Sequence, residues 1–320
     1  MAVNQQLSRL GWPLANSALE ALQPLVLVLG FQLGASHLVD GHNPINFCNG
    51  LLFGNAFSLV TLLVLRWLRP RQSSGRRGWQ WSDLRRVLLP VVSNALLEVA
   101  LVIALSRIAA VQVAVVMALG VVVLLLLASV REQRWPMPLS LLGAGLVVVA
   151  AAWSIPPGEG VAMTASMTPM GETLVANTAT GNGLLLLGLL VLSTVTLLSS
   201  EPVARDLGAL DYGIWQSLLQ TIIFLIWAIT TFGFSHLYDL QSPLLWQIML
   251  LYGAGISTLY TLCENLALAR SGPLMVSLFE GLLPLFSGLF ALGLLGEAFS
   301  TNLLLSALVT AVGIVCVELG

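Results

Sequence analysis

The chain has 320 residues, is 57% hydrophobic and only 9% charged, and has a mean hydropathy of +0.92. Because a soluble domain carries about 25% charged residues, this composition excludes an ordinary soluble protein and indicates an integral membrane protein. The net charge of −2 says little about partners, and the three cysteines lie far apart in apolar runs, which argues against a disulfide framework or a metal site.

Ten apolar runs are long enough to cross a bilayer, which takes about 20 mostly apolar residues. In chain order they cover 16–39, 45–68, 87–106, 108–130, 138–156, 183–200, 211–233, 243–268, 273–295 and 302–319. The first run is too long for the hydrophobic part of a signal peptide and has no clear cleavage site. We therefore interpret it as a retained span.

The arginines predict the orientation of these spans. With the N-terminus in the cytoplasm, twelve of the thirteen arginines fall on the cytoplasmic side, and only Arg107 falls outside. Cytoplasmic loops of membrane proteins carry such an excess of basic residues. We therefore predict an all-α integral membrane protein with ten transmembrane helices, located in the cell (inner) membrane, with both termini in the cytoplasm.

The long stretch 157–182 has no arginine and consists of small, polar and turn-forming residues. It is predicted to be a flexible external linker between two halves of the chain. Its methionines Met163, Met167 and Met170 suggest a soft-metal site as an alternative, which the lack of a nearby His or Cys disfavours.

The two halves resemble each other. "ALSRIAAVQVA" at 104–114 aligns with "ALARSGPLMVS" at 267–277, and each stretch ends one span and turns directly into the next. Five spans in each half is an odd number, so the second half must be inverted relative to the first, as in many secondary transporters. The predicted division is a first five-span repeat at 1–156, the linker at 157–182 and a second five-span repeat at 183–320.

This pattern resembles the ten-span, EamA-type branch of the drug/metabolite transporter superfamily. The likeness is best in "ALARSGPLMVSLFEGLLPLFSGLFALGLLGEAF", which has Pro284 within a span and Gly296-Glu297 closing it. The first half departs from the pattern, with Gly120 near the place of the proline and Arg131-Glu132 in place of Gly-Glu. The resemblance implies a central cavity lined by spans 1–4 and 6–9, alternating access, and the transport of small metabolites, often as efflux.

Four acids, Glu20, Glu98, Glu264 and Glu280, fall within predicted spans. A charged side chain near the bilayer centre costs about 2.5–3.5 kcal/mol on insertion scales, and no basic residue lies at mid-span to offset it. These acids either face a wet cavity or are held protonated. Both states suit substrate binding or proton coupling, so we take the four glutamates as candidate site residues.

Two of these acids precede a proline by four residues, in "EALQP" at 20–24 and "EGLLP" at 280–284. Because a proline cannot donate to the carbonyl four residues earlier, Pro24 and Pro284 predict helix breaks that leave the carbonyls of Glu20 and Glu280 free. Interrupted helices are typical of transporter binding sites. The alternative is a packing kink with the glutamate near the headgroups, which we favour for Glu20 but not for Glu280.

Polar residues near these acids are candidates for lining a cavity. Asn94 precedes Glu98 by four residues, Asn265 follows Glu264, and Gln112 and Ser277 are also predicted to be cavity-lining. Each could equally form an interhelical hydrogen bond. At the predicted outer face, "SHLVD" at 36–40 and "SHLYD" at 235–239, with His42 nearby, raise the alternative of a metal or pH-sensing site; we expect none.

The sequence lacks the phosphate-binding loop of ATPases, and it has no nucleophile–base or metal-hydrolase motif. We therefore predict a secondary transporter, not an enzyme, for a small neutral, zwitterionic or cationic metabolite. Uncoupled export, a non-transporting scaffold and an intramembrane enzyme stay as alternatives. The expected partners are a small-molecule substrate, the lipid bilayer and protons, with no cofactor and no nucleic acid, and a homodimer is left open.

Overall fold

The computed structural model describes residues 2–39, 43–69, 80–105, 110–153, 179–295 and 301–319. All the secondary-structure elements in these ranges are helices. The helices of the first half are α1 (Ala2–Ala35), α2 (Phe47–Leu68), α3 (Trp81–Leu105), α4 (Ala110–Glu132) and α5 (Pro138–Trp153). Those of the second half are α7 (Ala179–Leu207), α8 (Ala209–Phe232), η1 (Phe234–Gln241), α9 (Pro243–Met249), the π-helix η2 (Leu250–Ser257), α10 (Thr258–Ser271), α11 (Pro273–Glu280), α12 (Leu283–Leu295) and α13 (Thr301–Leu319).

In the described part of the chain, eight helices are long and apolar enough to cross a membrane, and the bent pair α11–α12 would make a ninth. The protein is therefore a multi-pass membrane protein, as predicted. The predicted span 138–156 corresponds to α5, which is shorter, with 16 residues. The predicted count of ten spans stays a prediction.

Glycines allow two of the tight turns between helices. Gly208 separates α7 from α8 with a φ of 80°, and Gly272 separates α10 from α11 with a φ of 85°. Side chains rarely adopt these left-handed values, whereas glycine does so at no steric cost. The turns are so short that each helix leads directly back into the membrane. The turn at Gly272 is the one that the aligned stretch "ALARSGPLMVS" predicts.

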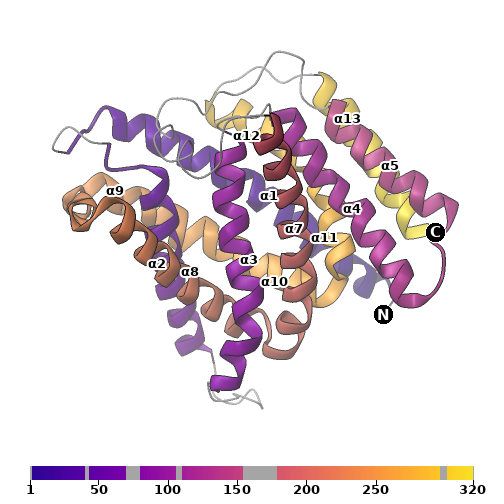
Figure 1. Cartoon of the computed structure of the whole chain (residues 1–320), viewed down its shortest axis with the longest axis horizontal. Helices are drawn as coiled ribbons and strands as arrows, with labels where there is room; N and C mark the ends of the chain where they lie inside the picture. The colour runs from indigo at the N-terminus through magenta and orange to yellow at the C-terminus, as the bar shows by residue number, and fades with distance from the viewer. Residues whose placement is uncertain are drawn as a thin grey trace.

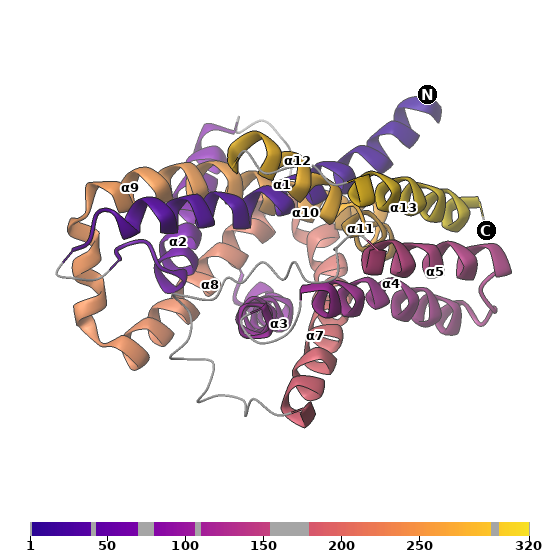
Figure 2. The same cartoon turned by 90° about the horizontal axis from the view of Figure 1, so that it is seen from above.

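The helices pack in pairs that join the two halves of the chain. α2 packs against α8, α3 against α7, α1 against α10 and α5 against α13. Figure 1 shows α3 and α7 running side by side, and α5 beside α13 at one end of the molecule. Figure 2, in which α3 is seen nearly end-on, shows α1 crossing the view beside α10. The two halves therefore do not form separate bodies.

The α5–α13 pair is closely packed because both helices present a glycine at their contact. A Cβ atom on Gly143 would lie 2.5 Å from the carbonyl oxygen of Gly313, and one on Gly313 would lie 2.7 Å from that of Gly143. Neither position has room for a side chain. Small residues that let two backbones approach are a common basis of helix association in membranes.

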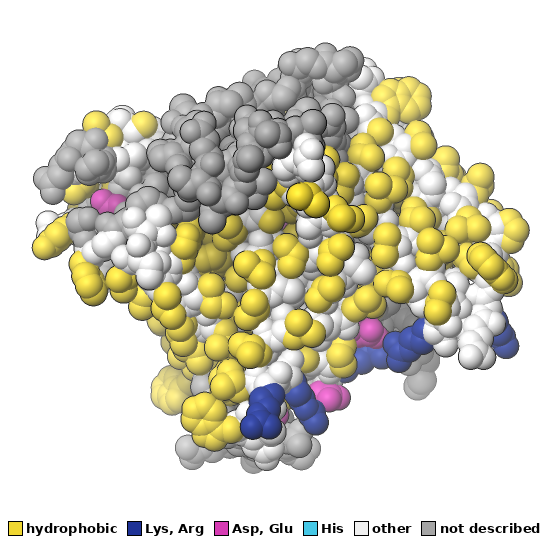
Figure 3. All heavy atoms as spheres, in the orientation of Figure 1, with side chains coloured by type: hydrophobic (Ala, Val, Ile, Leu, Met, Phe, Trp, Pro, Cys, Tyr) yellow, Lys and Arg dark blue, Asp and Glu magenta, His cyan; other side chains and the backbone are white. Residues whose placement is uncertain are grey.

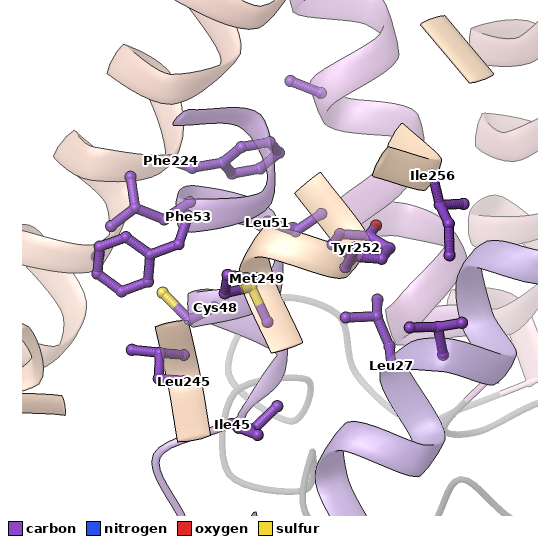
Figure 4. Close-up of a cluster of buried hydrophobic side chains, with 14 residues drawn as sticks. Leu27, Ile45, Cys48, Leu51, Phe53, Phe224, Leu245, Met249, Tyr252 and Ile256 are labelled. Carbon is purple, nitrogen blue, oxygen red and sulfur yellow. The ribbon is translucent and has the colours of Figure 1, made fainter. Parts of the chain in front are cut away.

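A hydrophobic cluster fills the space between α1, α2, α8 and the α9–η2 segment (Figure 4). Its members include Leu27 of α1, Leu51 of α2, Phe224 of α8, Met249 of α9 and Tyr252 of η2. Met249 and Phe224 are almost completely buried. This cluster joins spans from both halves of the chain, and it includes residues of α1 and α3.

The outer surface of the helices is largely apolar. In Figure 3, hydrophobic side chains spread over the middle of the visible face, while the arginine side chains lie along its lower edge. Exposed leucines such as Leu89, Leu96 and Leu187 belong to this apolar surface. A belt of this kind matches the hydrocarbon region of a bilayer, and charged residues gather where the helices reach water.

Candidate functional site

The four predicted glutamates lie on four different helical segments. Glu20 lies on α1, Glu98 on α3, Glu264 on α10, and Glu280 at the last residue of α11. The part of α1 that is apolar enough to cross a membrane is Leu10–Ala35, so this span begins before the predicted residue 16. Glu20 therefore lies near the middle of its helix and not near its inner end.

Glu98 ties α3 to α8. Its Oε1 atom accepts a hydrogen bond from Asn94 Nδ2 at 3.0 Å and a second from Gln220 Nε2 at 3.0 Å. Its other oxygen, Oε2, is buried and has no hydrogen-bond partner among the described residues. Asn94 therefore supports Glu98 from one turn earlier on the same helix, as its spacing in the sequence suggests.

Glu264 is enclosed on α10, with 6% of its surface exposed. The side chains of Gln216 and Tyr260 form hydrogen bonds with its carboxyl group. Asn265, the next residue, donates its Nδ2 to Gln216 Oε1 at 3.4 Å, so it supports a partner of Glu264 and does not contact the carboxyl directly. The Oε2 atom of Glu264, like that of Glu98, is buried without a partner in the described part of the chain.

Glu20 and Glu280 face each other across the α1–α11 contact. Glu20 interacts electrostatically with Glu280 and, less strongly, with Glu264, while the Ser277 side chain forms a hydrogen bond with Glu280. The Oε2 atom of Glu20 is buried without a partner in the described ranges, and so is Oδ1 of Asn16 one turn earlier. Two negative charges at these positions would repel each other, which favours a proton on one of the carboxyl groups or a cation beside them.

Tyr260 is the residue that connects the four acids. A charge on Tyr260 would be within electrostatic range of Glu264, Glu20, Glu280 and Glu98. It precedes Glu264 by four residues, so both side chains lie on the same face of α10. Sequence reasoning missed Tyr260 and the two glutamines of α8. They could have been recognised in the sequence because each is a polar residue within an apolar run, one helical turn from another polar residue.

The "EGLLP" stretch is where span 9 is interrupted. α11 ends at Glu280, α12 begins at Leu283, and the two helices meet at 47°. Gly281 is packed so closely that a Cβ atom there would lie 2.7 Å from Val147 Cγ1 and 3.0 Å from Thr310 Cγ2. The bend therefore seats the end of α11, which carries Glu280, against α5 and α13.

The corresponding expectation for "EALQP" is wrong. α1 runs as one helix from Ala2 to Ala35, through both Pro13 and Pro24, and Pro24 is exposed. Membrane helices tolerate proline because neighbouring groups and small adjustments satisfy the freed carbonyl. Pro24 therefore does not divide its span as the α11–α12 bend divides span 9.

An interruption that the sequence did not predict precedes Tyr260. Eight residues of span 8, Leu250–Ser257, form the π-helix η2. A Cβ atom on Gly253 would lie 2.6 Å from the carbonyl oxygen of Gly54, so η2 crosses α2 in direct backbone contact. Thr258 Oγ1 donates a hydrogen bond to the Gly253 carbonyl at 2.9 Å. π-helical segments often occur at functional sites, and this one leads into the helix that carries Tyr260 and Glu264.

The remaining predicted site residues are Ser277, Gln112 and the outer His and Asp residues. Ser277 is buried next to Glu280. Its Oγ atom lies 3.7 Å from the position that a Cβ atom on Gly120 would take. The side chain of Gln112 lies outside the described residues. At the predicted outer face, Asp40 and His42 and the side chain of His236 are also outside them.

Asp239, the described acid of the predicted outer group, has a structural partner. It accepts a hydrogen bond from Asn49 Nδ2 at 2.9 Å, which joins η1 to the start of α2. Within the described ranges, no three His, Cys, Asp or Glu side chains converge as metal ligands would.

Ion pairs join helices at the predicted cytoplasmic ends. Arg66 of α2 pairs with Asp211 of α8, and Arg86 of α3 pairs with Asp206 of α7 at 3.3 Å. Nearby, the guanidinium of Arg270 lies 5.4 Å from the centre of the Trp12 ring. The Arg86–Asp206 pair is exposed, and because exposed pairs contribute little to stability, we regard it as a contact that can open.

This combination of many apolar helices, a bent span and acids enclosed between helices defines a polytopic membrane protein with an internal polar site. Residues 179–319 match the EamA-like transporter family. A protein of Synechocystis sp. described as an uncharacterized transporter is 24% identical over 271 residues, which cover 81% of this chain and 72% of that protein.

The fold also has a counterpart among solved structures. One crystal structure matches with a TM-score of 0.59 and 13% identity, covering 97% of this chain and 99% of that one. At this identity the match speaks for the fold alone. The match of residues 179–319 to the EamA-like transporter family, together with the transporter-named relative, confirms the resemblance to the EamA-type branch seen in the sequence.

Proposed function

We propose that the protein is a secondary transporter that exports a small neutral, zwitterionic or cationic metabolite of the amino acid or amine class. Protons carried by the buried glutamates drive this export. The family match and the transporter-named relative support the transport function in general. The substrate class, the direction and the proton coupling are our inference from the site.

The observation that carries this proposal is the set of unpartnered carboxylate oxygens. Oε2 atoms of Glu20, Glu98 and Glu264 are buried on three helices and have no hydrogen-bond partner among the described residues. A buried polar atom without a partner costs about 1–3 kcal/mol, and more when it is charged. A site that keeps three of them is destabilised unless protons or a cationic group occupy it. Such a site suits a substrate that exchanges with protons.

The packing of the helices supports an inverted repeat. If spans 1–5 correspond to spans 6–10, the contact of α3 with α7 has its counterpart in the contact of α1 with α10. The α2–α8 and α5–α13 pairs then join equivalent spans to each other. This is the pattern expected of two halves related by a pseudo-twofold axis in the membrane plane. The acids of α3 and α10 would then lie on pseudo-equivalent spans.

Alternating access requires segments that can move around the site. The bend between α11 and α12 lies directly after Glu280, and the π-helix η2 lies directly before α10. Each of these two segments therefore interrupts a span next to a residue of the site, and we infer that the spans bend there during alternating access. The arginines along one edge of Figure 3 support a cytoplasmic location of that edge.

A screen in proteoliposomes tests the proposal. The purified protein is reconstituted with a pH-sensitive dye inside, and amino acids and amines are added singly. A transported substrate is expected to move protons in the opposite direction. Vesicles with Glu98→Gln protein serve as the control, because they correct for amines that cross the bilayer unaided.

A non-transporting scaffold is the alternative outcome. It predicts that the glutamates only fix the register of the helices. In that case no compound moves protons or accumulates in any vesicle, while Glu98→Gln and Glu264→Gln proteins lose stability. Substrate-dependent proton movement by the wild-type protein, absent in the Glu98→Gln protein, excludes the scaffold.

A further inference from the structure

Three unpartnered acceptor atoms belong to the two helices α1 and α10, which pack against each other (Figure 2). They are Oδ1 of Asn16 and Oε2 of Glu20 on α1, and Oε2 of Glu264 on α10. All three are buried and have no hydrogen-bond partner among the described residues. Asn16 has only 1% of its surface exposed. Because buried polar atoms in proteins are almost always hydrogen-bonded, the amide oxygen of Asn16 needs an explanation as much as the carboxylates do.

Two contacts place these atoms at one level of the bundle. Near the predicted cytoplasmic end, Arg270 of α10 lies over the ring of Trp12 of α1. Glu20, eight residues after Trp12, is within electrostatic range of Glu264, six residues before Arg270. The two helices therefore run in opposite directions past each other. Asn16 lies halfway between Trp12 and Glu20 on the same face of α1, so it is level with the turn of α10 that follows Glu264.

The number and kind of these acceptors fit a primary ammonium group. Such a group, like the end of a lysine side chain, has three N–H donors and no acceptor. Two carboxylate oxygens and one amide oxygen offer each donor its own acceptor, and two of these hydrogen bonds join opposite charges. A quaternary ammonium group has the same charge but no N–H donor, so it would leave all three acceptors without partners.

The surroundings also favour an organic cation at this place. Glu280 is a further acid within electrostatic range of Glu20. The chain has no lysine, and the arginines that the structure describes lie near the ends of their helices. A calcium or magnesium ion takes six or more oxygen ligands, and three free acceptors fall short of that number.

We propose that Asn16, Glu20 and Glu264 bind the substrate through a primary ammonium group. Asn16 accepts the third N–H donor and thereby selects primary amines over more highly methylated ones. This inference rests on the proposed function, because the ammonium group takes the place of the protons that the glutamates otherwise carry. It adds a specificity-determining residue and a defined head group, which simple amines and amino acids share.

Two series of compounds that lose one N–H donor at each step test the proposal. Methylamine, dimethylamine, trimethylamine and tetramethylammonium have the same charge and a falling number of donors. Glycine, sarcosine, dimethylglycine and betaine change in the same way beside a carboxylate, so they show whether amino acids enter the site. Binding is measured by saturation-transfer NMR titration of the protein in lipid nanodiscs, and empty nanodiscs correct for the lipid.

The variants separate recognition of the third donor from a structural role. Asn16→Ala removes the third acceptor, and Asn16→Leu, which is similar in volume, replaces it if that variant does not fold. Ser17→Ala is the matched control, because Ser17 is completely buried at the next position and its hydroxyl already donates to the Pro13 carbonyl at 3.1 Å.

We expect the wild type to bind methylamine roughly tenfold tighter than dimethylamine, the effect of one hydrogen bond with a charged group. Asn16→Ala should bind these two amines alike, whereas Ser17→Ala should keep the preference. If the glycine series binds, the same order should hold for glycine and sarcosine.

Equal or tighter binding of tetramethylammonium would mean that charge alone is recognised, so the inference would be wrong while the proposed function stands. A preference that Asn16→Ala keeps, or that Ser17→Ala loses as well, would overturn the role of Asn16. If no compound of either series binds, the inference is wrong, and proton movement with larger substrates in the transport screen decides the proposed function separately.

Discussion

The close packing of Gly281 predicts how strongly the bend in span 9 depends on that glycine. An alanine there would place its Cβ atom 2.7 Å from Val147 Cγ1, 3.0 Å from Thr310 Cγ2 and 3.1 Å from the carbonyl oxygen of Leu278. Val147 is completely buried, so it has little room to move. Overpacking of this kind costs about 1–3 kcal/mol, and we expect Gly281→Ala to lower the free energy of unfolding by that amount.

A second substitution tests the cause of this loss. Val147→Ala removes the methyl group that is closest to the added Cβ atom, and alone it should cost about 1–2 kcal/mol through the cavity that it leaves. In the double variant the new Cβ atom fills part of that cavity. The double variant should therefore lose less stability than the sum of the two single losses, with a coupling of roughly 0.5–3 kcal/mol.

The assay is reversible unfolding of the purified protein in mixed micelles, followed by circular dichroism. Gly293→Ala in α12 is the matched control, because a Cβ atom there would meet nothing within 4 Å. It should stabilise the protein by about 0.5–1 kcal/mol, the usual gain from replacing a helical glycine. A Gly281→Ala protein of wild-type stability, or losses that simply add in the double variant, would refute the packing argument.

Three further predictions concern the site, the π-helix and the topology. Gln220→Leu should destabilise the protein by about 1–3 kcal/mol in the same unfolding assay, because it removes a donor from the buried carboxyl of Glu98. Gly253→Ala should lower the melting temperature because η2 touches the backbone of α2 there, whereas Gly255→Ala, with nothing within 4 Å of its Cβ position, should not. A cysteine placed at Ser166 should react with a membrane-impermeant maleimide in intact cells, and labelling only after permeabilisation would contradict the predicted orientation.

The sequence predicted the helices well because their determinants are local. Apolar runs and flanking arginines placed most spans to within a few residues, as in α2 at Phe47–Leu68 against the predicted 45–68. The four glutamates were also recognisable, because an acid within an apolar run is costly wherever the helix packs. Asn94 and Ser277 were recognisable as polar neighbours of Glu98 and Glu280. Gln216 and Gln220 were not, since they reach the acids only through the packing of α8 against α10 and α3.

The interruptions of the helices also depend on packing contacts that local sequence patterns do not reveal. Both prolines four residues after a glutamate predicted a break, yet only the span of Pro284 is divided, with the bend at Gly281 and Leu282. Pro284 lies in the first turn of α12, where a missing N–H costs nothing, and close packing against Val147 requires the glycine. The π-helix η2 contacts α2 through Gly253 and Gly54, and no local pattern in the sequence reveals this contact.

The central claim is that the buried glutamates carry the protons that drive transport, and vesicle measurements on Glu98→Gln and Glu264→Gln test it most directly. With a substrate from the screen, exchange of labelled for unlabelled substrate is measured beside accumulation driven by a pH gradient. Glu132→Gln, at the exposed end of α4, is the control and should retain both activities. We predict that the two buried variants keep exchange and lose accumulation. Wild-type accumulation by both would contradict the account.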